Sequence, residues 1–171
     1  MRSVLLIVIV MAAATTLLGS RAGTPGAFAC AGPDQSLVRM TAQQLSVTPP
    51  SYAFLVTNLS NAAITGIVLG RRDVTMHIIG IAANVPGSME APRGWEGRPV
   101  HVEETRYLYY LWENKDPSQR IVPQQSAAGF RITLPLATDP AQVSFDRIPF
   151  EVALADGSCR WGLVGMDKLA K

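Results

Sequence analysis

The sequence predicts an all-β fold, an antiparallel β-sandwich of about seven to eight strands that follows a signal-peptide helix. Short segments after residue 36 alternate apolar and polar side chains, the period of a strand with one buried face. Turn residues separate these segments, and the chain contains 12 prolines and 14 glycines. Many short strands separated by turns are typical of an antiparallel sandwich.

Residues 1–29 have the pattern of a signal peptide, and residues 30–171 are expected to form one domain. Arg2 supplies the positive start, Val4 to Leu18 is an apolar run, and Ala27-Phe28-Ala29 is the small-x-small motif of a cleavage site. The run is shorter than the roughly 18–20 apolar residues that cross a bilayer. We expect a secreted or periplasmic protein that begins at Cys30 and has no stable membrane insertion after cleavage. An uncleaved anchor is the alternative.

The predicted strands are short runs rich in β-branched and aromatic residues, each ending at a turn. Asp156-Gly157 lies between two alternating runs and is the clearest hairpin signal in the chain. The predicted strands are Leu37–Val47, Tyr52–Thr57, Ile64–Leu69, Val74–Ile81, Gly129–Leu134, Phe150–Leu154 and Cys159–Leu163. The side chains expected in the core are Phe54, Val56, Ile67, Phe130, Ile132, Phe150, Val152 and Trp161.

Two segments are less regular. Glu103 to Glu113 fits a helix or a strand, and its tyrosines and tryptophan favour the strand because they suit a pleated surface. Asn84 to Val100 is rich in proline and glycine, so we expect neither helix nor strand ladder there. A long irregular loop of this kind is often functional.

The succession of strands and turns also resembles a known group of proteins. The residues that carry the likeness are Tyr52-x-Phe54, Val56-Thr57-Asn58, Gly70, Pro92-Arg93-Gly94-Trp95, Trp112, Ile121-Val122-Pro123, Ser126 and Gly129-Phe130. This part of the chain resembles exported bacterial Ig-like or fibronectin-like β-sandwich proteins of uncharacterised function. The resemblance implies a fold and carries no catalytic residues. The Cys-Trp-Cys trio of small cell-surface Ig domains is absent.

Cys30 and Cys159 are the two cysteines, and they lie near the two ends of the chain that remains after cleavage. In an oxidising compartment such a pair is expected to form a disulfide. The alternative is a lipid anchor on Cys30. A lipobox prefers a large aliphatic residue three places before the cysteine, where this chain has Ala27, so the disulfide is favoured.

Charge and motifs exclude several classes of function. Arg2 and Arg21 fall in the signal peptide, so the remaining chain has 13 basic and 13 acidic side chains. No basic run is present to bind nucleic acid. His101 and Glu103 have the spacing that opens a zinc deaminase motif, but its paired cysteines are missing. We therefore expect no metal, no cofactor and no enzyme activity.

Aromatic side chains are the remaining candidates for ligand contacts. Trp95 lies in the Pro/Gly segment, and Tyr107 and Tyr109 belong to a cluster of aromatics. Exposed aromatic rings stack on sugars or anchor protein interfaces. The alternative is a central strand buried on both faces, with Trp95 folded back as a plug.

We expect an exported, non-enzymatic binding or structural module whose partner is an unknown protein or glycan. A carbohydrate-binding module that uses Trp95, Tyr107 and Tyr109 is one alternative. A small secreted enzyme whose site is assembled in space is the other, with His77, His101 and Glu103 as candidates.

Overall fold

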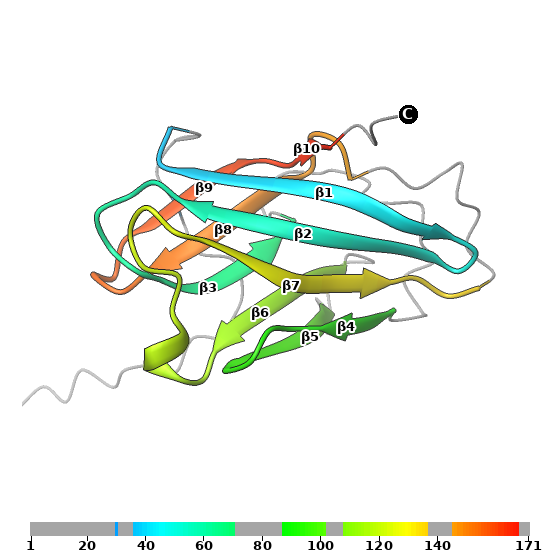
Figure 1. Ribbon diagram of the computed structural model, residues 1–171, viewed down its shortest axis with the longest axis horizontal. Helices are drawn as coiled ribbons and strands as arrows, with labels where there is room; N and C mark the ends of the chain where they lie inside the picture. The colour runs from blue at the N-terminus through cyan, green and yellow to red at the C-terminus, as the bar shows by residue number, and fades with distance from the viewer. Residues whose placement is uncertain (1–29, 31–35, 71–86, 102–107, 137–144, 168–171) are drawn as a thin grey trace, which may run out of the picture.

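The computed structural model describes residues 30, 36–70, 87–101, 108–136 and 145–167, with the backbone alone at 101, 108 and 109. The signal peptide (1–29), the predicted strand Val74–Ile81 and residues 103–107 of the ambiguous segment lie outside the described residues. The described residues form ten strands in two five-stranded sheets, which lie one in front of the other in Figure 1. In this part of the chain, no helix has the length and apolarity to cross a membrane. The predicted β-sandwich is confirmed.

The first sheet is built around β2 (Pro50–Asn58). Its strands run in the order β10 (Gly165–Met166), β1 (Val38–Val47), β2, β7 (Ser126–Thr133) and β4 (Ser88–Glu90). All neighbours are antiparallel except β10 and β1, which pair in parallel. The parallel pair departs from the purely antiparallel arrangement that the sequence predicted.

The second sheet is built around β3 (Ile64–Leu69), with the order β5 (Trp95–His101), β6 (Leu108–Asn114), β3, β8 (Pro149–Leu154) and β9 (Cys159–Leu163). The predicted hairpin joins β8 to β9. Gly157 has a φ of 83°, and the Asp156 carboxylate accepts from the backbone N and the hydroxyl of Ser158 at 2.9 and 2.7 Å. Glycine adopts such a positive φ without the steric cost that a side chain adds.

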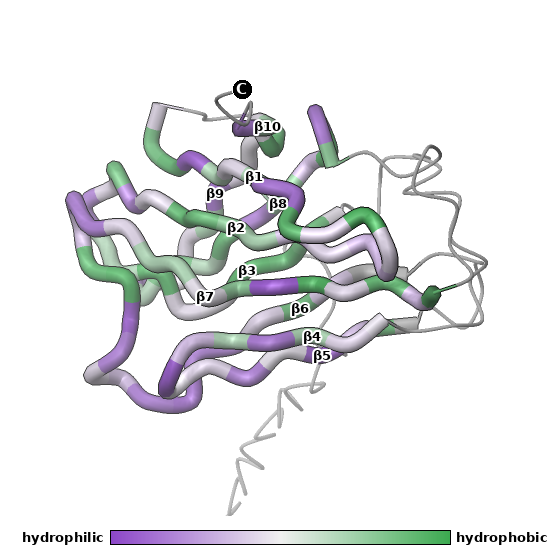
Figure 2. Tube along the Cα trace, turned by 45° about the vertical axis from the view of Figure 1, so that its right-hand side comes forward, coloured by the Kyte–Doolittle hydropathy of each residue, from purple (hydrophilic) through white to green (hydrophobic). Residues whose placement is uncertain are grey.

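Aromatic rings fill the space between the sheets. Trp112 on β6 lies 5.7 Å from Phe54 on β2 and 5.5 Å from Phe130 on β7, ring centre to ring centre. Phe145 lies 5.2 Å from Phe54 and 4.6 Å from Tyr52. These tilted and edge-on contacts suit the ring quadrupoles and bury large apolar areas. Figure 2 shows long apolar stretches along the central strands and a largely hydrophilic connection between β6 and β7.

The predicted core is confirmed at seven of eight positions, and Trp161 is the exception. Trp161 pairs with Glu151, whereas the buried Val152 pairs with Arg160. Since side chains alternate along a strand, Trp161 belongs to the outer face of the second sheet and is only half-buried.

The prediction that Asn84 to Val100 is irregular is wrong, because β4 and all but the last residue of β5 lie within it. Gly94 makes the turn between them, with a φ of 79°. Pro99 is tolerated because β5 is an edge strand, where a missing backbone N–H need not break a ladder. A Cβ on Gly97 would lie 2.8 Å from the ring of Trp112, so glycine gives the indole its space. Among the described strands, β4, β5 and β10 are the three that the sequence did not predict.

Candidate binding site at one end of the sandwich

Trp95 does not form an exposed aromatic surface. Its side chain is 8% exposed, its ring meets Phe130 edge-on at 5.3 Å, and its Nε1 donates to the Gln119 carbonyl at 2.8 Å. The expectation of an exposed tryptophan in this segment is not met. The alternative, in which Trp95 folds back as a plug, is the arrangement found.

The tyrosine cluster is described only in part. Tyr107 lies outside the described residues, and for Tyr109 the backbone is placed on β6 opposite Val100. Their neighbours Tyr110 and Trp112 are buried between the sheets, and Leu111 is buried on the opposite face against Val68. At these positions β6 is therefore covered on both faces.

Of the histidine and carboxylate candidates, the structure describes only the backbone of His101. His101 has its backbone at the end of β5, while His77 and Glu103 lie outside the described residues. Among described residues, no group of three His, Cys, Asp or Glu side chains is placed to hold a metal ion.

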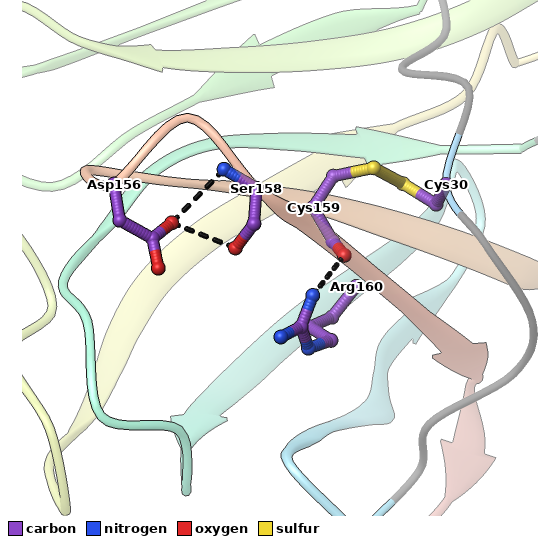
Figure 3. Close-up of a disulfide and its surroundings, with 5 residues drawn as sticks. All are labelled: Cys30, Asp156, Ser158, Cys159 and Arg160. Carbon is purple, nitrogen blue, oxygen red and sulfur yellow. Dashed lines mark hydrogen bonds between the residues drawn. A yellow bond between two sulfur atoms is a disulfide. The ribbon is translucent and has the colours of Figure 1, made fainter.

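The predicted Cys30–Cys159 disulfide is confirmed. The two Cα atoms lie 5.3 Å apart, and Figure 3 shows the bridge joining the N-terminal segment to β9. The bond uses the thiol that a lipid anchor on Cys30 would need. Two strands that are far apart in sequence also meet here, since β1 and β9 lie along one edge of the sandwich.

Close to this bridge the end of the sandwich is hollowed into an open depression of about 620 Å³, which we call the end depression. It combines residues from the turn before β1, the β2–β3 loop, the segment that precedes β7, and β9. Its lining residues are Leu37, Leu59, Ser60, Asn61, Pro123, Gln124 and Arg160.

A buried asparagine holds the walls of the end depression. Asn58 is fully buried, and its Nδ2 donates to the carbonyls of Ala62 and Ile121, both at 2.8 Å. Its Oδ1 accepts from the backbone N of Ser60 at 3.0 Å and lies 2.6 Å from the Ser60 hydroxyl. One amide thus ties the β2–β3 loop to the segment that precedes β7. We call these two segments, 58–62 and 121–125, the Asn58 corner.

Backbone hydrogen bonds complete the Asn58 corner. Gln124 has a φ of 64°, a conformation rarely adopted by residues with a side chain, and its backbone N donates to the Asn58 carbonyl at 2.8 Å. Its side-chain Nε2 donates to the Leu59 carbonyl at 3.3 Å. The Leu59 N–H donates in turn to the Leu37 carbonyl at 2.9 Å. Hydrogen bonds therefore tie three of the lining residues, Leu37, Leu59 and Gln124, to one another.

Among the described lining residues, Arg160 is the one that carries a formal charge. Its Nη1 donates to the Cys159 carbonyl at 2.7 Å (Figure 3). Asp156 lies on the adjoining turn. Hydrogen bonds from the Ser158 hydroxyl and backbone N–H, together with the charge of Arg160, hold the pKa of Asp156 below its usual value.

Sequence reasoning did not identify the end depression. Asn58-Leu59-Ser60-Asn61 is recognisable as a turn cluster, and an asparagine at a strand end followed by Ser60 two residues later could have indicated a side-chain cap. Arg160 and Gln124 carry no such signal, since their importance depends on long-range neighbours.

Comparison with known proteins finds only distant likenesses among solved structures. No family model and no curated protein matches the chain. It is similar to an uncharacterised protein from Nocardia farcinica with an immunoglobulin-like fold, at 15% identity over 72% of this chain and 82% of that chain, with a TM-score of 0.49. It is similar to a CBM of Ruminiclostridium thermocellum, at 11% identity over 74% of this chain and 98% of that one, with a TM-score of 0.46.

A third solved structure, the GH20 exo-β-N-acetylglucosaminidase of Vibrio harveyi, has 10% identity over 76% of this chain but 18% of its own length, with a TM-score of 0.39. At such identities and TM-scores, nothing about the role of this chain follows from these likenesses.

Proposed function

We propose that this protein is an exported, non-enzymatic β-sandwich that binds a small ligand in the end depression. The observation that carries the proposal is a depression of about 620 Å³ whose polar walls are fixed by the buried Asn58. Pockets of a few hundred to about a thousand Å³ suit small ligands. Loops held by a rigid scaffold are where binding residues commonly lie.

The lining chemistry supports binding rather than catalysis. It consists of aliphatic carbons, two amides, one hydroxyl and one guanidinium. The Ser60 hydroxyl lies 2.6 Å from Asn58 Oδ1 and 2.9 Å from the Ala62 carbonyl, and neither atom is a general base. A nucleophile needs an adjacent base to activate it, and none of the described lining residues supplies one.

Export is supported by the disulfide together with the signal-peptide pattern, because disulfides persist in oxidising compartments. Intact-mass measurement on protein from an exporting host should give a chain that begins at Cys30, lacks lipid and has lost two hydrogens to the bridge. A mass increased by acyl chains, or a retained residue 1–29 segment, would contradict this part of the proposal.

Binding is tested by nuclear magnetic resonance with protein purified from an exporting host. A panel of mono- and oligosaccharides and short peptides is added, and ligand-dependent shifts are mapped onto the chain. We expect the shifts to gather at the Asn58 corner and Arg160. Asn61→Ala should weaken binding without lowering stability, because this side chain is exposed on the loop.

The matched control is Gln119→Ala, an exposed side chain on the β6–β7 connection that does not line the end depression. Its binding should equal that of the unmodified protein. Shifts confined to the β6 segment, and lost in Tyr107→Ala or Tyr109→Ala, would instead support a carbohydrate-binding module that uses these tyrosines. Absence of binding across the panel would contradict the proposed function.

A further inference from the structure

We propose that the end depression binds a segment of peptide, with an apolar side chain placed in the depression and the peptide backbone held by Asn61 and Gln124. The inference rests on the proposed function and specifies the class of its ligand. Two amide side chains and three aliphatic ones supply most of the lining. A few polar groups set in apolar surface are the usual composition of a ligand pocket.

Hydrogen bonds within the fold leave a small set of polar groups for a ligand. The buried Ser60 hydroxyl lies 2.6 Å from Asn58 Oδ1, so its hydrogen is already donated within the Asn58 corner. Gln124 donates through Nε2 to the Leu59 carbonyl at 3.3 Å, which leaves its Oε1 as an acceptor. The Asn61 side chain is exposed and makes no hydrogen bond to the described residues, so its whole amide faces a ligand.

These groups match a peptide backbone. A primary amide offers two N–H donors and a carbonyl acceptor. Asn61 can therefore bond both the C=O and the N–H of the ligand backbone, and Gln124 Oε1 can accept from a second N–H. The buried Asn58 joins the two segments that carry these side chains, through its bonds to the carbonyls of Ala62 and Ile121.

The apolar part of the lining suits an aliphatic side chain. It consists of Leu37, Leu59 and Pro123. Aliphatic surfaces attract one another in proportion to the area that they remove from water. A sugar ring fits less well, because none of the described lining residues carries an aromatic ring on which it could stack. The depression is open to solvent, so a segment of a longer chain can enter it.

The test is a nuclear magnetic resonance titration of the disulfide-intact protein with capped tripeptides. The caps remove the terminal charges, so the comparison does not depend on Arg160. The probes are acetyl-Ala-Leu-Ala-N-methylamide, the corresponding all-alanine peptide and a neutral galactose oligomer of similar size. We expect the leucine peptide to bind roughly tenfold more tightly than the alanine peptide, because it buries three more carbons. The galactose oligomer should bind more weakly than the leucine peptide.

The backbone contact is tested by replacing each N–H of the leucine peptide in turn with an ester oxygen. Each ester removes one donor and keeps the shape of the ligand. One of them should bind about threefold to tenfold more weakly to the unmodified protein, the range for a single hydrogen bond. Gln124→Met keeps the length of the side chain but removes its carbonyl. In this variant the same ester and the amide should bind equally, because the partner of that N–H is gone.

The matched control is Gln125→Met. Gln125 is the exposed neighbour of Gln124 and does not line the end depression, so this variant should keep the difference between ester and amide. If Gln124→Met fails to fold, the ester series measured on Asn61→Leu decides in the same way, since Asn61 is exposed on its loop.

Binding of the galactose oligomer without binding of the peptides would overturn this inference and leave the proposed binding function standing. Equal affinity for the leucine and alanine peptides would also overturn it, as would an ester effect that persists in both Gln124→Met and Asn61→Leu. Absence of binding by every probe would count against both the inference and the proposed function.

Discussion

The interior between the sheets and the Asn58 corner are held together by different forces. In the interior, the ring of Trp112 contacts the rings of Phe54 and Phe130. At the Asn58 corner, a single buried amide supplies hydrogen bonds to Ala62, Ile121 and Ser60. We infer that apolar burial mainly stabilises the interior. Directional hydrogen bonds mainly set the geometry of the Asn58 corner.

The directional character of hydrogen bonds matters for the end depression, whose walls adjoin the Asn58 corner. Apolar contacts are non-directional and tolerate small shifts, whereas hydrogen bonds weaken steeply when distance or angle changes. A loop fixed by Asn58 can therefore hold Ser60 in place beside the end depression.

The largest expected effect is on the interior. Trp112→Ala removes a fully buried indole that contacts Phe54 and Phe130 and donates to the Glu90 carbonyl at 3.0 Å. We expect a loss of about 3–5 kcal/mol in the free energy of unfolding, typical of a large aromatic truncated in a core. Urea denaturation measures it. Trp112→Phe, which keeps a ring, should lose clearly less, and equal losses would show that the Glu90 bond dominates.

The disulfide should rank next. The bridge joins residues 129 apart in sequence, so it restricts the unfolded chain strongly. Replacing both Cys30 and Cys159 by serine should lower stability by about 2–4 kcal/mol. Ligand binding should weaken as well, because Cys159 adjoins Arg160. Two free thiols in denatured, unreduced wild-type protein would disprove the bridge itself.

Asn58→Ala should cost about 2–3 kcal/mol, since it leaves buried backbone groups without partners. The Asn58 corner and the interior should differ most clearly in how a loss of stability affects ligand binding. We expect Asn58→Ala to weaken ligand binding in protein that is still folded, whereas Trp112→Phe should not. Asn61→Ala, on the same loop but exposed, is the control and should change stability by less than about 0.5 kcal/mol. Unchanged binding in Asn58→Ala would refute the role of the corner.

The smallest effect concerns Tyr110, whose buried hydroxyl has no hydrogen-bond partner among the described residues. Burial raises the pKa of Tyr110 from 10.0 to about 12. Because the folded-state pKa is the higher one, the contribution of this group is complete below pH 10 and is lost as the pH rises from 10 to 12. Tyr110→Phe should reduce this alkaline destabilisation and leave stability at pH 7 unchanged or raised by up to about 1 kcal/mol. Thermal unfolding from pH 7 to 12 measures both, and a marked loss at pH 7 would show that the hydroxyl is satisfied.

Local patterns were sufficient for much of the architecture. Alternation predicted β2 and β8, the Asp156-Gly157 pair predicted the β8–β9 hairpin, and the positions of Cys30 and Cys159 predicted the disulfide. Prediction from local pattern failed for β5, where the position of the strand in the sheet outweighs the low strand propensity of proline and glycine. Pro99 and Gly97 fit a strand only because β5 is at an edge and passes close to Trp112.

By itself the sequence determined the fold class, most strand positions, the disulfide and most of the core, because each depends on periodicity or on residue type. The tertiary structure alone decided that Trp95 is buried, that Trp161 lies on an outer face and that Arg160 lines a depression with Leu37 and Gln124. These outcomes depend on which strands meet and in which register. Long-range pairing sets both, and no local pattern in the chain encodes it.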